Sequence, residues 1–114
     1  MRMWKVPTEF LCRKHLLGEH VEHHMFVGTH KKAVRLNGYI DKGLLDTSYL
    51  SKRHAELVAE MTKRGYNHRS PIDEDVCADV AIKYHNYRRD VDIDGNIQEL
   101  IRRCPDCAAR ISGS

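Results

Sequence analysis

The segment Cys12–His24, with the sequence CRKHLLGEHVEHH, concentrates reactive side chains in a short stretch of predicted helix. It holds four of the eight histidines of the chain, together with a thiol and two carboxylates. At about 100° per residue, His15, Glu19, Glu22 and Phe26 fall within about 60° of arc on one side of such a helix. Paired carboxylates beside an imidazole are groups that acid–base catalysis uses.

A plain surface helix is the alternative interpretation of this segment. Glu19 and Glu22 would then be solvated acids that pair with nearby basic side chains, which is the commoner situation on helices. In both interpretations we expect the opposite side of the helix to face the core. That side carries Phe10, Leu17, Val21 and Gly28.

The remaining pattern predicts a compact, all-α single domain over residues 1–114, with three principal helices behind an extended N-terminal segment. We expect the first helix at about 8–35, stopped by Asn37-Gly38, and a loop over 38–46. The second helix should begin after a cap at 46 or 47 and end at 64, with Gly65 as its C-terminal glycine. Its core stripe is Leu50, His54, Leu57 and Met61.

The second half of the chain is less regular until about residue 96. The stretch DVCADVAIKY at 75–84 could form a short helix or a strand. From Asn96 onward, apolar residues recur at helical spacing through Ile111, and Pro105 predicts a kink or a restart within this third helix.

The stretches HLLGEHVEHHMFVGTHKK and LSKRHAELVAEMTKRGYN resemble the pyrimidine-dimer DNA glycosylase family, over about residues 1–70. The resemblance implies a three-helix fold and combined glycosylase and abasic-site lyase activity. The family nucleophile is the α-amine of the N-terminus, which falls on Met1, and its essential acid falls on Glu22. The family histidine and earlier glutamate fall on His15 and Glu19, and a basic residue falls on Arg2.

This chain also departs from the phage member of the family. Two arginines of that enzyme are replaced by Val21 and Met25, and its aromatic-rich tail is replaced by CAARISGS. These departures concern the lesion that is recognised more than the chemistry. The resemblance therefore leaves open which damaged or modified base is excised.

An α-amine suits this chemistry because such groups have pKa values near 7.7–8.0, so part of the population is an uncharged nucleophile near neutral pH. Attack on C1′ of a nucleotide would displace the base and leave a Schiff base. Glu22 would stabilise the charge on the sugar and transfer protons, so we expect no cofactor and no catalytic metal. Arg2 disfavours methionine removal, so Met1 should be retained and should pass close to Glu22.

The expected partner is double-stranded DNA, and the net charge of +3 fits a polyanion. Besides His15 and Glu19, the basic candidates for DNA contact are Arg2, Arg13, Lys14, Lys31, Lys32 and Arg64, with Lys5, Arg35, Lys63 and Arg69 as further cations. Trp4 and Tyr66 could stack on bases, although packing in the core is an equal alternative for Trp4. We expect a monomeric, cytoplasmic protein without signal peptide or membrane span.

The cysteines allow a second hypothesis. Cys12-x2-His15 and Cys104-x2-Cys107 could form a zinc site of three thiolates and one imidazole between the first and third helices. We favour buried thiols, because Cys104 lies on the core stripe and the resemblance assigns His15 to the DNA site. The corresponding alternative function is a non-catalytic basic DNA-binding module, with or without a zinc staple.

Overall fold

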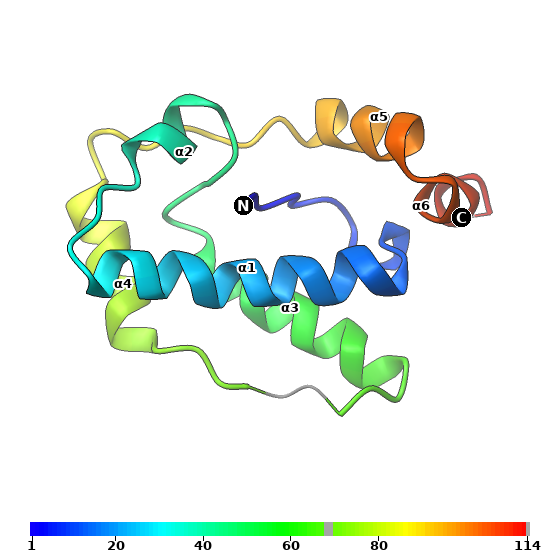
Figure 1. Ribbon diagram of the computed structural model, residues 1–114, viewed down its shortest axis with the longest axis horizontal. Helices are drawn as coiled ribbons and strands as arrows, with labels where there is room; N and C mark the ends of the chain where they lie inside the picture. The colour runs from blue at the N-terminus through cyan, green and yellow to red at the C-terminus, as the bar shows by residue number, and fades with distance from the viewer. Residues whose placement is uncertain (68–69, 114) are drawn as a thin grey trace.

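Helices account for all the regular secondary structure in the computed structural model, which describes residues 1–67 and 70–113 (Figure 1). The elements are a 3-10 turn η1 (Thr8–Phe10) and the helices α1 (Arg13–Lys31), α2 (Asn37–Asp41), α3 (Leu50–Lys63), α4 (Glu74–Lys83), α5 (Ile93–Arg103) and α6 (Pro105–Ser112). The all-α prediction is confirmed. The predicted loop over 38–46 is wrong in its first part, because α2 begins at Asn37, and the open choice at 75–84 is resolved as helix α4.

The first helix is shorter than predicted at both ends. After the 3-10 turn, Leu11 and Cys12 adopt extended backbone angles, so α1 begins at Arg13 and not near Thr8. At the other end α1 stops at Lys31, and Ala33 has a φ of 59°, a left-handed conformation that a right-handed helix cannot contain. The chain has therefore left the helix before it reaches Asn37.

The predicted orientation of α1 is also wrong. Its buried residues are Leu16, Glu19, His20, His23, Phe26 and Val27. Val21, which we expected in the core, is 54% exposed. The reason is tertiary, because Arg53 of α3 pairs with Glu19 and makes a carboxylate acceptable inside the protein.

The second principal helix, α3, has the predicted apolar stripe, and all four of its members are buried. It ends as expected, with Gly65 at a φ of 81° directly after the last turn. Its start lies at Leu50, because Asp46 accepts hydrogen bonds from the backbone and hydroxyl of Ser48 and so forms a turn before the helix.

The third predicted helix is divided in two at Cys104. Asp92 caps the N-terminus of α5 through the amide of Gly95, and the helix begins at Ile93, before the predicted Asn96. Cys104 is extended, with φ −131° and ψ 105°, and Pro105 opens α6 in the first helical position. The predicted restart at Pro105 is confirmed.

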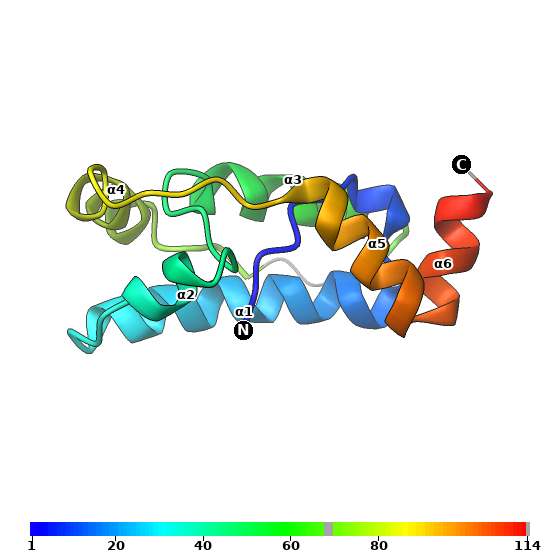
Figure 2. The ribbon, with the colours of Figure 1, turned by 90° about the horizontal axis from the view of Figure 1, so that it is seen from above.

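The molecule is flat and elongated, 40 × 30 × 17 Å, with α1 running along it (Figures 1 and 2). One apolar core lies at the end where α2 and α4 meet the last turns of α1, and a second lies at the end that α5, α6 and η1 share with its first turns. The N-terminal segment contributes Met3 to the first core and Trp4 to the second. In the described part of the chain, no helix has the length and apolar character needed to cross a bilayer.

Candidate active site and its geometry

A cavity of about 310 Å³ opens where the N-terminal segment passes the middle of α1. Its lining consists of Met1, Arg2, Trp4, His15, Glu22, Leu44 and Arg103. Four of the residues predicted for the site, Met1, Arg2, His15 and Glu22, are thus brought together around one space. They come from two segments, the N-terminus and α1, which contact each other through a hydrogen bond between Arg2 and Glu22.

Hydrogen bonds fix the first residues of the chain. The amide of Met3 donates to the carbonyl of Leu44 at 2.7 Å, and the amide of Arg2 donates to Oε2 of Glu22 at 3.2 Å. Covalent geometry keeps the α-amine of a residue within about 4 Å of the next amide nitrogen. The α-amine of Met1 is therefore within about 7 Å of the Glu22 carboxylate, close enough for one bound sugar to lie between them.

Two guanidinium groups and an imidazole share the cavity with the Glu22 carboxylate. The guanidinium groups of Arg2 and Arg103 lie 4.3 Å and 5.4 Å from the ring centroid of Trp4. Burial, and then the charge of Arg103, lower the pKa of Arg2 below its ordinary value. Burial, followed by the charges of Lys14 and Arg103, also lowers the pKa of His15. Cations held this close to one another favour the arrival of an anion such as a phosphate.

Trp4 forms a wall of this cavity and belongs to the core at the same time. It is 5% exposed, and its ring meets that of His15 edge to face at a centroid distance of 5.9 Å. Asn96 donates to its carbonyl oxygen at 2.8 Å. Of the two alternatives for Trp4, the structure supports packing in the core, and part of the side chain also lines the cavity.

Glu19 does not line the cavity. Its carboxylate accepts hydrogen bonds from Nε and Nη2 of Arg53 at 2.6 and 2.9 Å, and its side chain has no exposed surface. Burial would lower the pKa of Arg53, but its hydrogen bonds to Glu19 raise that pKa above the ordinary value. The ion pair joins α1 to α3, and Arg53 also donates a hydrogen bond to the carbonyl of Val6 at 2.7 Å.

The predicted DNA-contacting cations fall into two groups. Arg13, Lys14, Lys31 and Lys32 are exposed at the two ends of α1. Arg64 is instead held by the fold, because it pairs with Glu60 at 2.8 Å and donates to the carbonyls of Thr8 and Leu11. Arg69 lies outside the described residues.

Arg103 and Leu44 are the cavity residues that sequence reasoning missed. Arg103 ends α5, far along the chain from the glutamate that it faces, and its helix carries a second arginine at 102 that does not line the cavity. The one available signal was the adjacent Cys104-x2-Cys107 motif, which by itself indicates buried thiols or a zinc site and not a DNA contact.

A larger cavity of about 530 Å³ lies on the other side of the N-terminal segment, between Lys5–Glu9 and α3. We regard the smaller cavity as the better candidate, because it alone of these two contains both the N-terminal residue and Glu22. A nucleophile and an acid–base group that line the same space are what a displacement at a sugar carbon needs.

Among the residues that the structure describes, two groups of side chains could hold a metal ion. The first is Cys12, His15, Cys104 and Cys107, and the second is His20, His24 and His54 between α1 and α3. In each group, the possible ligand atoms lie within 4.8 Å of one another. The first group touches the cavity through His15, and the second does not.

Comparison with known proteins identifies the family of the chain. A family profile described as Pyrimidine dimer DNA glycosylase matches residues 1–74 of the 114-residue chain. No curated protein and no solved structure gives a match. The matched segment contains Met1, Arg2, His15 and Glu22 and ends at the start of α4, so Arg103 and two of the clustered cysteines lie beyond it. Since the match covers well over half of the chain, the protein belongs to the pyrimidine dimer DNA glycosylase family, a family of DNA repair enzymes.

Proposed function

We propose that this protein is a bifunctional DNA glycosylase and abasic-site lyase that uses the α-amine of Met1 as its nucleophile and Glu22 as its acid–base group. The observation that carries the proposal is the shared cavity, in which the Arg2 amide is bonded to the Glu22 carboxylate. Family membership supplies the glycosylase class and DNA as the partner.

The first step of the proposed reaction takes place at C1′ of the damaged nucleotide. The uncharged α-amine attacks this carbon, the bond from C1′ to the base breaks, and the base leaves with the bonding electrons. Positive charge develops on the sugar during the attack, and the carboxylate of Glu22 stabilises it. The ammonium formed at C1′ then passes a proton through Glu22 to O4′, the bond from C1′ to O4′ breaks to open the sugar ring, and the C1′=N bond of the Schiff base forms, while the departed base takes a proton from water.

The second step cleaves the strand. A proton is removed from C2′ of the Schiff base, and the bond from C3′ to its phosphate oxygen breaks by β-elimination. Glu22 is the group proposed to move these protons. Arg2 and Arg103 are proposed to hold phosphates beside the cavity, and the position of both guanidinium groups against the same ring supports this role.

Access to C1′ in a duplex requires that the nucleotide leave the stack, which is easiest for damaged or weakly paired bases. The exposed cations Arg13, Lys14, Lys31 and Lys32 are proposed to hold the flanking duplex through its phosphates, without selecting a sequence. We propose that the protein acts as a monomer, since one chain contributes every group of the cavity.

A cleavage assay on defined duplexes tests this function. One duplex would carry a pyrimidine dimer and a second an abasic site. A further set of duplexes would each carry one other modified base, and all reactions would contain EDTA. We expect base release and a β-elimination product from at least one damaged duplex, and cleavage at the abasic site. Tight DNA binding without any cleavage would instead support the alternative of a non-catalytic DNA-binding module.

A further inference from the structure

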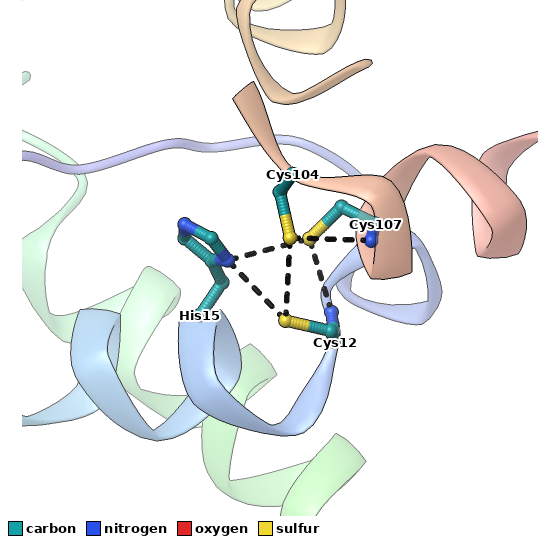
Figure 3. Close-up of side chains that lie close together, drawn as sticks. All are labelled: Cys12, His15, Cys104 and Cys107. Atoms are coloured by element: carbon teal, nitrogen blue, oxygen red, sulfur yellow. Dashed lines mark hydrogen bonds between the residues drawn. The ribbon is translucent and has the colours of Figure 1, made fainter. Parts of the chain in front are cut away.

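The junction between α5 and α6 meets the first turn of α1 through three thiols and an imidazole (Figure 3). Cys12 and His15 come from the start of α1, and Cys104 and Cys107 from the start of α6. The four side chains point toward one another. From this convergence we infer that Cys12, His15, Cys104 and Cys107 form a structural zinc site that fastens the C-terminal helices to the catalytic part of the chain.

The separations of the ligand atoms fit a tetrahedral ion. Sγ of Cys12 lies 3.3 Å from Nδ1 of His15 and 3.9 Å from Sγ of Cys104, and Sγ of Cys107 lies 3.5 Å from the same Nδ1. A zinc ion with bonds of about 2.3 Å to sulfur and 2.0–2.1 Å to nitrogen requires ligand atoms that are about 3.5–3.8 Å apart. The side chains need only small adjustments to reach that geometry.

The backbone around the cluster stabilises thiolates. Cys12 precedes α1 and Cys104 precedes α6, so two helix N-termini point their partial positive charge at the site. The amide of Cys12 donates to Sγ of Cys107 at 3.2 Å, and the amide of Cys107 donates to Sγ of Cys104 at 3.4 Å. Donors of this kind orient and stabilise metal-bound sulfur.

The charge of the surroundings also fits the ligand set. Three thiolates and a neutral imidazole around Zn²⁺ give the centre a net charge of −1, and Lys14 and Arg103 lie near His15. The three sulfur ligands select zinc or a similar soft ion over Mg²⁺ or Ca²⁺. Two of the cysteines are buried and Cys104 is half-buried, as expected for a closed structural site.

The zinc site would fix the position of Arg103, which forms part of the active-site cavity. Arg103 precedes Cys104 directly and lines the cavity, and His15 borders both the cluster and the cavity. With Nδ1 on the metal, the other ring nitrogen of His15 would carry the proton, and the ring would stay against that of Trp4, whose centroid lies 5.9 Å away. The metal is thus proposed to take no part in the chemistry, but to hold Arg103 in the cavity from beyond the family-matched segment.

Metal analysis of the purified protein, prepared without chelators, tests the site independently of activity. We expect about one zinc per chain, lost in Cys12→Ser and Cys107→Ser and retained in the matched control Cys77→Ser, which removes a buried thiol from the other core. His15→Cys should retain zinc through four thiolate ligands, whereas His15→Ala should bind it at least tenfold more weakly. Zinc that persists in both serine variants would overturn the assignment, because it would then lie elsewhere, for example at His20, His24 and His54.

Two measurements on the wild-type protein guard against variants that fail to fold. X-ray absorption at the zinc edge should show three sulfur neighbours and one nitrogen neighbour, and replacement by Co²⁺ should give the intense thiolate and d–d absorption bands of a tetrahedral site. A metal-free protein with a Cys12–Cys104 disulfide, or a zinc shell made of nitrogen and oxygen alone, would overturn the proposal. None of these results depends on whether the protein cleaves DNA.

Discussion

Glu19 and Glu22 lie one helical turn apart on α1, but their carboxylates have opposite surroundings. Glu19 is buried and paired with Arg53, whereas Glu22 lines the cavity and accepts a hydrogen bond from the amide of Arg2. The same substitution at the two positions should therefore separate chemistry from stability. This pair gives the proposed mechanism an internal control.

Glu22→Gln should reduce strand cleavage at least about 100-fold, since a positioned acid–base group typically contributes 10²–10⁴-fold. The amide keeps the shape of the side chain and can still accept from Arg2. Thermal unfolding and DNA affinity should therefore stay close to wild type. Single-turnover cleavage measures the loss of catalysis, and equilibrium binding on the same preparation measures the retained affinity. Near-normal turnover would exclude Glu22 from the mechanism.

Glu19→Gln should behave in the opposite way. It removes the fully buried counter-charge of Arg53 and leaves only the pairing with the more exposed Glu56, which costs up to roughly 3–5 kcal/mol of folding free energy. Denaturant unfolding would measure the loss. At a temperature where the variant is still folded, its cleavage rate should lie within a few-fold of wild type, and a selective loss of catalysis without loss of stability would contradict the structural role.

Stability should fall in mild acid because of His23. Burial, opposed by the hydrogen bond to the Glu19 carbonyl, lowers the pKa of His23 to about 3. Unfolded histidine binds a proton near pH 6.5, so between that value and about pH 3 the unfolded state is favoured by up to about 1.4 kcal/mol per pH unit from this group. Above pH 6.5 His23 is neutral in both states, so this loss of folding free energy is absent there.

The pH dependence of the unfolding free energy measures this effect. His23→Leu should flatten the profile between pH 6 and 4, whereas the exposed control His85→Gln should leave the slope unchanged. Equal slopes in the wild type and in His23→Leu would assign acid destabilisation to other groups, such as His54, whose pKa is also lowered by burial.

Arg102 and Arg103 offer a matched comparison at the end of α5. Both pair with Glu99, but Arg103 alone of the two lines the cavity. Arg103→Ala should weaken binding to duplex DNA and lower the salt slope by about 0.9, the value for one phosphate contact. Arg102→Ala should change neither. Binding isotherms across a range of salt concentrations would decide between them, and identical slopes would remove Arg103 from the DNA interface.

Removal of the metal should loosen the end of the molecule that carries Arg103. Exhaustive chelation should lower the melting temperature by more than about 5 °C, since each kcal/mol shifts Tm of a domain of this size by roughly 4–8 °C. Trp4 is the single tryptophan and lies against His15 and Arg103, so its fluorescence should shift to longer wavelength. Zinc should restore both signals, and an unchanged melting curve would argue against a structural ion.

Local signals in the sequence predicted the elements that local chemistry controls. The stripe of α3, the glycine after it and the break at Pro105 follow from residues that are close together in the chain. The orientation of α1 could not be predicted in this way, because the burial of Glu19 depends on Arg53 from another helix. The shared cavity was expected from the family resemblance, but Arg103 enters it only because α6 packs against η1 and the end of α5 lies beside Trp4.

Borohydride trapping tests most directly whether the α-amine of Met1 attacks the sugar. The protein would be incubated with a duplex that carries an abasic site, reduced with borohydride, digested and mapped by mass spectrometry. We predict a covalent adduct on the α-nitrogen of Met1, and no adduct when that amine is acetylated. An adduct on a lysine side chain, or full cleavage by the acetylated protein, would contradict the account.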